Sequence, residues 1–140
     1  MVTREQIRKR IEEDKVEYLL VQFVDINGSP KVKMVPVSHL DDVVDEGAGF
    51  AGAAVSGLGQ GPHSHDMMAR IDFSTYSVAP WTDGVARVAS DLYVDGEPYM
   101  YCARQNFKRV LSIAEKKGYI FNVGIEPEHF LVTKDEKGSI

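Results

Sequence analysis

The sequence contains one cysteine, Cys102, and no apolar run long enough to span a bilayer. A single cysteine cannot form an internal disulfide, which agrees with a reducing compartment. Because Cys102 has no convincing catalytic partner nearby in the sequence, we interpret it as a packed thiol. The opening residues, MVTREQIRKR, lack the apolar core of a signal peptide. We therefore expect a cytoplasmic protein that has no membrane partner.

An excess of basic charge is also missing, since the formal net charge is -5 and the lysines and arginines are scattered. Without a basic stripe to pair with phosphates, sequence-independent binding of nucleic acid is not expected. The chain has 44% hydrophobic and 26% charged residues, which is typical of a globular protein. Its 140 residues suffice for one domain, or for a small domain and the start of another.

The first third of the chain predicts a helix followed by a hairpin. Thr3 and Gln6 form the pattern of a capping box, which predicts a short charged helix that ends near Lys15. The segments 18–24 (YLLVQFV) and 31–37 (KVKMVPV) have the composition of strands. Between them, DINGSP carries the Asn-Gly signal of a tight turn, so we expect two antiparallel strands.

A change of composition follows this hairpin. Ser38 is in place to cap a short helix over HLDDVVDE, after which the chain reads GAGFAGAAVSGLGQGP. Such small residues cannot form a core by themselves, so other parts of the protein must hold this loop or it stays mobile. Loops of this kind often carry function. It is a weak candidate for a phosphate cradle because it lacks a lysine and a strong preceding strand.

The second half of the chain predicts a further hairpin and an amphipathic helix. We expect a strand over 85–94, a turn at Asp95-Gly96 and a possible returning strand over 97–100, limited by Pro98. An apolar stripe at helical spacing then predicts the next helix, with Gly118 just beyond its end. The stripe consists of Phe107, Val110, Leu111 and Ala114.

We expect a strand over 119–131 to pack against this stripe. Its alternation places Glu126 and Glu128 together on the polar face, near enough to bind one hard divalent cation or two neighbouring ones. The alternative is that these glutamates simply face water, and spacing alone favours that interpretation. Gly124 and Pro127 agree slightly better with a site than with a plain exposed strand.

The segment Pro62-His63-Ser64-His65-Asp66 brings two imidazoles and a carboxylate close together in sequence. Side chains of this kind can bind a metal ion. A flexible His-x-His-Asp segment is weak evidence for such a site, and a solvated turn is the favoured interpretation.

The order of these segments resembles that of the glutamine synthetases, ATP-dependent ligases that couple glutamate to ammonia. FVDINGSPKVKMVP is similar to the early hairpin of that family, and GFAGAAV followed by SHDM is similar to its glycine-containing loop. APW, RVASD, DGEPY, the helix after CAR and finally GIEPEHFL occur in the family's order. Together these pieces cover nearly the whole chain.

The resemblance implies an α+β fold. Residues 1–104 would form a β-grasp domain, and residues 105–140 would provide the first helix and strand of the catalytic domain. Glu126 and Glu128 match the strand glutamates that bind Mg²⁺ or Mn²⁺ in the family. There, ATP phosphorylates the γ-carboxylate of glutamate and an amine displaces the phosphate, so ATP, glutamate and an amine are the implied reactants. Two stacked rings of identical subunits are the implied assembly.

The loop at Phe50-Ala51-Gly52-Ala53-Ala54 departs from the family, which usually has Phe-Asp-Gly-Ser-Ser there. In the family, the aspartate helps to bind and deprotonate ammonium. Methyl groups in place of the carboxylate and hydroxyls remove acceptors for an ammonium ion and leave an apolar surface. Methylamine or another larger amine would suit this surface better, so the branch with the γ-glutamylmethylamide synthetases is the most similar.

Other positions also follow from the resemblance. Cys102-Ala103-Arg104 stands where the family commonly has Asp-Pro-Arg, which removes a helix cap. Asp66 and Met67 are implied to be loop residues near the active site of the neighbouring subunit. The remaining metal ligands and the nucleotide pocket of the family would lie beyond residue 140, so we expect no catalysis by this chain alone. The alternative is a noncatalytic β-grasp interaction module derived from the same family.

Overall fold

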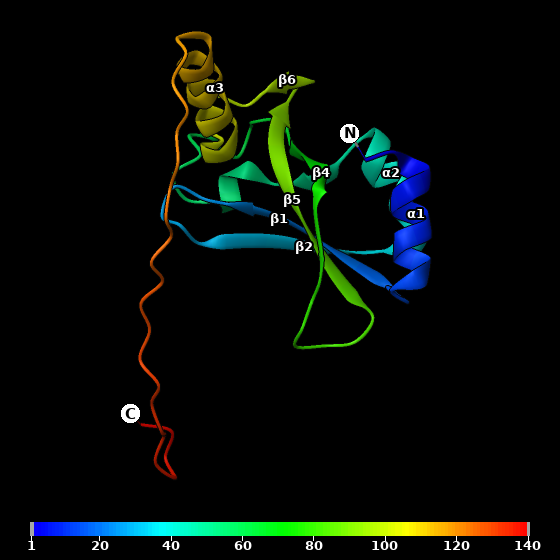
Figure 1. The fold of residues 1–140 in the computed structure, drawn as a ribbon, viewed down its shortest axis with the longest axis vertical. Coiled ribbons are helices and arrows are strands. Elements are labelled where there is room, and N and C mark those ends of the chain that lie inside the picture. Colours follow the sequence, from blue (N-terminus) through cyan, green and yellow to red (C-terminus); the bar gives the residue numbers. More distant parts are fainter. Residues whose placement is uncertain (1, 140) are drawn as a thin grey trace.

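A mixed β-sheet organises this computed structural model, which describes residues 2–139 (Figure 1). The strand order is β2 (Pro30–Pro36), β1 (Tyr18–Val24), β5 (Val85–Val94), β4 (Met67–Val78) and β3 (Ala48–Phe50), and β6 (Glu97–Pro98) pairs with β5. β1 and β5 are parallel, whereas the other neighbours are antiparallel. The predicted strands 18–24, 31–37 and 85–94 are thus confirmed to within one residue at each end.

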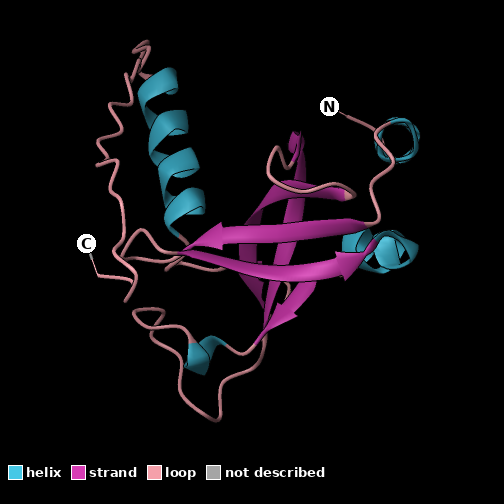
Figure 2. Cartoon of the chain, turned by 90° about the horizontal axis from the view of Figure 1, so that it is seen from below, coloured by secondary structure: helices cyan, strands magenta, loops and turns pink. Residues whose placement is uncertain are grey.

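Two helices, α1 (Arg4–Glu13) and α2 (Leu40–Asp45), lie together beside the sheet (Figures 1 and 2). The predicted capping box of α1 is confirmed, because Thr3 and Gln6 bond to each other's backbone N–H groups. α1 buries Ile7 and Ile11, and α2 buries Leu40 and Val43. These side chains belong to the same hydrophobic core as the inner face of the sheet.

The predicted cap of the second helix is wrong. Ser38 lies inside a short 3₁₀ segment, η1 (Val37–His39), and His39 takes the position before α2 without a side-chain hydrogen bond to the helix. The chain turns into η1 directly after Pro36 at the end of β2, two residues before the start that the sequence pattern indicates. Ser38 therefore lies inside η1, one residue before the position that caps α2.

The hairpin between β1 and β2 depends on Asp25, whose side chain is buried. One of its carboxylate oxygens accepts hydrogen bonds from the backbone N–H groups of Asn27 and Ser29, both at 2.9 Å. The Lys31 ammonium lies 3.3 Å from the other oxygen. The bond from Ser29 contributes most to a pKa of Asp25 below its usual range, and the contacts with Asn27 and Lys31 act in the same direction against the effect of burial.

The longest strand, β4, has no counterpart among the predicted elements. It begins at Met67, which is fully buried, so the prediction that Met67 belongs to a loop is wrong. The alternation of β4 is interrupted by a shift of its register against β5 between Asp72 and Ser77. That shift, together with polar residues in the middle of the strand, hides the pattern of a half-buried strand from the sequence.

Helix α3 (Ala103–Lys116) lies at the other end of the sheet from α1 and α2 (Figures 1 and 2). The residue before it, Cys102, makes no side-chain hydrogen bond to the helix, which confirms the missing cap. Its thiol is instead packed: Cys102 is 3% exposed, and Sγ accepts a hydrogen bond from the Leu92 N–H at 3.5 Å. The interpretation of Cys102 as a packed residue is confirmed.

An ionic cluster attaches α3 to the sheet. The Arg104 guanidinium bonds Asp91 at 2.8 Å and Asp72 at 2.6 Å, and Lys108 contacts the same two carboxylates. Burial opposes ionisation of Asp72, but hydrogen bonds from Ser74 and Arg104 outweigh it and hold the pKa of Asp72 well below its usual range. Asp72, Asp91 and Arg104 are partly buried, so each of these charges needs its partner. Lys108 is exposed.

The predicted strand over 119–131 is wrong, since this segment is extended without pairing to any strand among residues 2–139. It passes α3 and then leaves the body of the domain (Figure 1). Only its beginning packs as expected, where the rings of Phe107 and Phe121 meet edge to face with centroids 6.4 Å apart. A strand requires hydrogen bonds from a neighbour, and the sequence pattern does not indicate whether a neighbour is present.

We predict that Arg104→Met lowers the free energy of unfolding by about 1–3 kcal/mol, because it leaves two partly buried carboxylates with one cation in place of two. Urea unfolding followed by circular dichroism measures this change. Arg109→Met, on an exposed position of the same helix, is the control and should change stability by less than about 0.5 kcal/mol. Equal effects of the two substitutions would show that the ionic cluster contributes nothing specific.

Candidate functional site

The loop that departs from the family pattern starts at Phe50, the last residue of β3. Phe50 pairs with Met67 of β4 through the backbone, and its ring meets the Phe23 ring edge to face with centroids 5.0 Å apart. Phe23 is 3% exposed and belongs to the core. The loop thus leaves the sheet from a well-anchored residue, so its position is determined by the core.

After Phe50 the chain forms a single 3₁₀ turn, η2 (Gly52–Ala54). Two backbone hydrogen bonds close the turn, from Ala54 to Ala51 and from Val55 to Gly52, both at 3.0 Å. Ala51, Ala53 and Ala54 are exposed, whereas Gly52 is buried. The loop therefore presents methyl groups outward on an ordered turn.

Gln60 explains why Gly52 has no side chain. A Cβ atom built on Gly52 would lie 1.4 Å from Oε1 of Gln60, so the amide occupies the space that any larger residue needs. The Gln60 amide also donates to the carbonyl of His65 at 3.2 Å. One side chain thus joins the first turn of the loop to its last residues.

The middle of the loop is held by the segment after β6. Leu58 is 1% exposed, and its carbonyl accepts a hydrogen bond from the Tyr99 hydroxyl. The Tyr101 ring lies 3.2 Å from the position of a Cβ on Gly59, which has a φ of +66°. Other parts of the protein therefore hold this glycine-rich stretch. This was the first of the two alternatives that the sequence left open.

The end of the loop contains the His-x-His-Asp segment. One of its side chains, His65, contacts another part of the chain. His65 Nδ1 lies 2.5 Å from the Asp95 carboxylate in the β5–β6 turn, and both side chains are well exposed. This hydrogen bond and the charge of Asp95 raise the pKa of His65. Within residues 2–139, no three His, Cys, Asp or Glu side chains gather as a metal site would require. His65 is therefore paired with Asp95, and the described residues bring no third such side chain to the pair.

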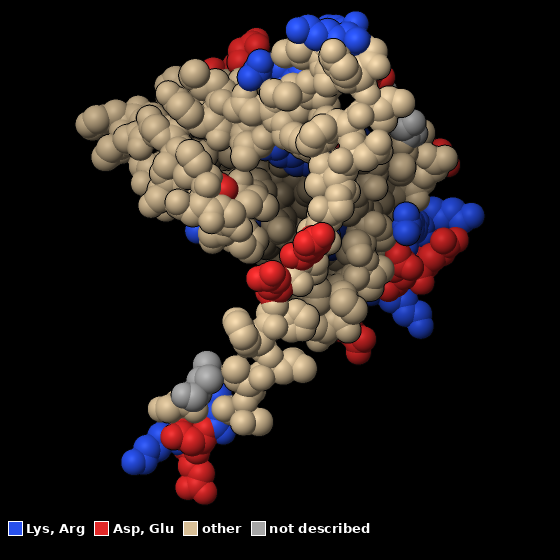
Figure 3. Space-filling view, turned by 60° about the vertical axis from the view of Figure 1, so that its left-hand side comes forward, with Lys and Arg blue, Asp and Glu red and all other residues tan. Residues whose placement is uncertain are grey.

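Glu126 and Glu128 lie in the extended segment after α3, and both are exposed. The structure does not bring them to the loop at Phe50–Ala54, nor, in the part it describes, to a third acidic or histidine ligand. Asp66 is exposed immediately before β4. On the face drawn in Figure 3, acidic and basic side chains form small separate groups between wide uncharged areas.

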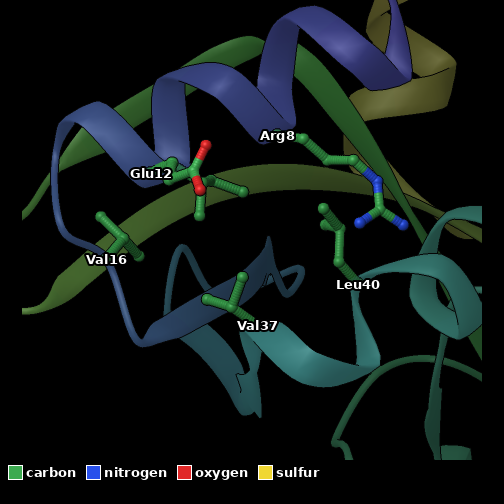
Figure 4. A pocket seen from close by; sticks show the side chains of 6 residues that line it. Arg8, Glu12, Val16, Val37 and Leu40 are labelled. Carbon is green, nitrogen blue, oxygen red and sulfur yellow. The ribbon is translucent and has the colours of Figure 1, made fainter.

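A groove between α1 and the η1–α2 segment is lined by residues outside the loop (Figure 4). Its volume is about 380 Å³, and apolar side chains such as Val37 and Leu40 form one wall. Two charged residues, Arg8 and Glu12, also line it, and Arg8 is already paired with Asp41. The groove is separate from the candidate loop.

In residues 2–139, no helix is long and apolar enough to cross a membrane.

Comparison with known proteins identifies the fold. Residues 15–95 match the family described as glutamine synthetase, beta-Grasp domain. The chain belongs to this family. The matched residues run from the end of α1 to the β5–β6 turn, and they include the whole loop from Phe50 to Asp66. The β-grasp domain and the α+β fold predicted from the order of sequence motifs are confirmed.

Two relatives are equally similar in sequence. The chain is 45% identical over 127 residues to a glutamate–methylamine ligase of Methyloversatilis universalis, covering 90% of this chain and 29% of that protein. It is also 45% identical over 141 aligned residues to a glutamine synthetase of Staphylococcus aureus, covering 97% of this chain and 31% of the relative. The chain therefore spans less than a third of the length of these relatives.

The fold is also found in solved structures of GmaS. A complex of GmaS with ADP superposes with a TM-score of 0.75 at 32% identity, covering 84% of this chain and 26% of that chain. GmaS without ligand gives the same TM-score and identity. The β-grasp domain is thus shared in sequence and in three-dimensional structure.

Sequence patterns missed the residues that hold the loop in place. Gln60, Tyr99 and Asp95 contact the loop from positions that no local motif distinguishes. The one available signal was Gly52, since a glycine between alanines in an ordered turn indicates a close approach by another group. Which group approaches depends on the tertiary fold.

We predict that Gly52→Ala lowers the free energy of unfolding by about 1 kcal/mol, because the new methyl group must displace Gln60 from its bond to His65. Thermal or urea unfolding measures the change. Gly61→Ala is the matched control, since a Cβ there meets open space. If the explanation is correct, Gly52→Ala has little effect in a Gln60→Ala background; an undiminished cost in that background would contradict it.

We further predict that Asp95→Asn lowers the pKa of His65 towards the ordinary value of 6.5. Because the folded pKa is raised, the stabilisation by this pair is complete below about pH 6.5 and is lost as the pH rises through the folded value. Nuclear magnetic resonance titration of the imidazole C–H signals measures the shift. Asp66→Asn, which removes a neighbouring carboxylate, should leave the His65 pKa unchanged; an equal shift would point to general charge and not to the Asp95 contact.

Proposed function

We propose that this chain is the β-grasp part of an ATP-dependent ligase that joins glutamate to methylamine, or to another amine larger than ammonia, through a γ-glutamyl phosphate. The observation that supports the choice of amine is the ordered turn at Ala51–Ala54, which exposes methyl groups and no carboxylate. The family membership and the named relatives support the ligase chemistry.

Overall identity does not distinguish the two reactions, since the glutamate–methylamine ligase and the glutamine synthetase are equally similar to the chain. The loop supplies the distinction. An ammonium ion donates four hydrogen bonds and needs acceptors, whereas methylamine replaces one donor by a methyl group that can contact alanine. A single methyl group in an apolar pocket changes the preference by roughly 10- to 200-fold. The relative solved with ADP supports the proposal of a nucleotide substrate.

Glu126 and Glu128 are proposed to bind Mg²⁺ or Mn²⁺ in the longer protein. Carboxylate oxygens are hard donors that suit both ions, so the residue types fit. Two carboxylates on an extended, exposed segment do not complete a coordination shell, and the described residues add no third ligand. These glutamates would thus contribute to a shell that other residues of the enzyme share, and the ion would neutralise phosphate charge there.

We also propose that the domain boundary lies near residue 104, where α3 begins. The extended segment after α3 would then belong to the catalytic domain. A ring of identical subunits and a cytoplasmic location are proposed on the same family grounds. The exposed apolar side chains of α3, such as Phe107, Val110 and Ile113, agree with a helix that other protein covers.

The amine preference can be tested by exchanging β-grasp segments. In the first chimera this chain replaces the matching segment of the S. aureus glutamine synthetase, and in the second it replaces that of the M. universalis ligase. We predict that the first chimera gains at least about tenfold in its ratio of kcat/KM for methylamine over ammonia. ADP release at varied amine concentration measures both constants.

Ala51→Asp in the same chimera should return the ratio towards ammonia, because it restores an acceptor for ammonium. Ala103→Asp, which adds the same charge to an exposed alanine outside the loop, is the control and should leave the ratio unchanged. An active chimera that retains the ammonia preference of the synthetase would refute the proposed role of the loop.

A further inference from the structure

One side chain connects the two edges of the sheet. In the strand order, β2 and β3 stand at opposite ends and are not hydrogen-bonded neighbours. Yet the Lys33 ammonium of β2 donates a hydrogen bond to the carbonyl of Gly49 in β3 at 2.6 Å. The twist of the sheet therefore brings its edges close enough for a lysine to reach across.

The same ammonium also faces the residue from which the candidate loop departs. It lies 5.7 Å from the centroid of the Phe50 ring, within the range of a cation–π interaction. On its edge, Phe50 meets the buried ring of Phe23. Phe50 is thus held between a cation from one sheet edge and an aromatic ring of the core.

This connection matters because β3 is short and lies at the edge of the sheet, although Ala48 and Phe50 also pack against the core. The strand is three residues long, pairs only with β4 in the part of the sheet that the structure describes, and ends one residue before Ala51. A short edge strand is easily displaced, because few hydrogen bonds must break together. Any group that fixes Gly49 and Phe50 therefore also fixes where the turn Ala51–Ala54 stands.

We propose that Lys33 is a positioning residue for the loop that selects the amine. Its hydrogen bond to Gly49 and its contact with Phe50 keep the turn Ala51–Ala54 in place, while Lys33 itself does not contact the reacting groups. A lysine suits this role, since its flexible stem allows one ammonium to satisfy a carbonyl and a ring together. The inference concerning the amine depends on the proposed function; the inference concerning the loop does not.

The first arm of the test uses this chain alone. Hydrogen exchange of the Ala54 and Val55 amides reports the two bonds that close the turn. We expect Lys33→Met to accelerate both by roughly tenfold, and Lys33→Arg, which keeps a donor and a cation, to stay within about twofold of the wild type. Lys9→Met, on the exposed side of α1, should change neither rate. Because Lys33 is exposed, circular dichroism should show all variants folded.

The second arm uses the M. universalis chimera. Lys33→Met should raise the KM for methylamine roughly five- to tenfold, with kcat and the KM for glutamate within about twofold, and Lys33→Arg should restore the KM. Faster exchange together with this selective rise supports the proposal. Unchanged exchange overturns it whatever the kinetics. Faster exchange with an unchanged KM for methylamine overturns the role of the loop in amine binding, and so the proposed function, while Lys33 still positions the loop.

Discussion

The parallel pairing of β1 with β5 is the constraint on which the rest of the fold depends. Val21 and Val88 stand opposite each other in this pair, and both are completely buried. Parallel strands cannot be joined by a tight turn, so the chain between them must travel around the sheet and return. β2, α2, β3, the glycine-rich loop and β4 all lie on this path. Their positions follow because the chain between β1 and β5 must return to place β5 beside β1.

The candidate loop gains much of its order from this arrangement and not from its own residues alone. A stretch of glycine and alanine buries too little apolar area to fix itself. Instead, β3 introduces the loop, Gln60 within the loop bonds to the His65 carbonyl, and Tyr99 and Asp95 hold its middle and end. Tyr99 and Asp95 belong to segments distant in sequence, so the position of the loop depends on the whole domain. The proposed role, to distinguish amines by one methyl group, would require such a fixed background.

The sequence predicted those elements whose signals are local. The Thr3–Gln6 capping box, the Asn-Gly turn and the regular alternation of β5 depend on neighbouring residues, and the structure contains all of them. Elements whose stability comes from distant partners were mispredicted. The register shift in β4 concealed a long strand, and the alternation after Tyr119 indicated a strand where no neighbour exists among residues 2–139.

The features of the candidate site also divide into those that the sequence predicts and those that depend on the tertiary fold. The absence of carboxylate and hydroxyl groups at Ala51–Ala54 could be recognised from the sequence order alone. The groups that fix this turn could not be recognised, because Lys33 reaches Gly49 across the sheet and Gln60 fills the space beside Gly52 only in the folded chain. The grouping of Glu126 with further ligands is likewise a matter of tertiary arrangement, and the described residues bring none to it.

The packing of Cys102 gives the domain a built-in chemical reporter. It is the only thiol in the sequence, it is 3% exposed, and it stands where the last turn of the sheet passes into α3. A reagent can reach Sγ only when that junction opens, since Leu92 and the core otherwise enclose it. The rate of thiol modification under native conditions therefore counts how often α3 separates from the sheet, without any label or substitution.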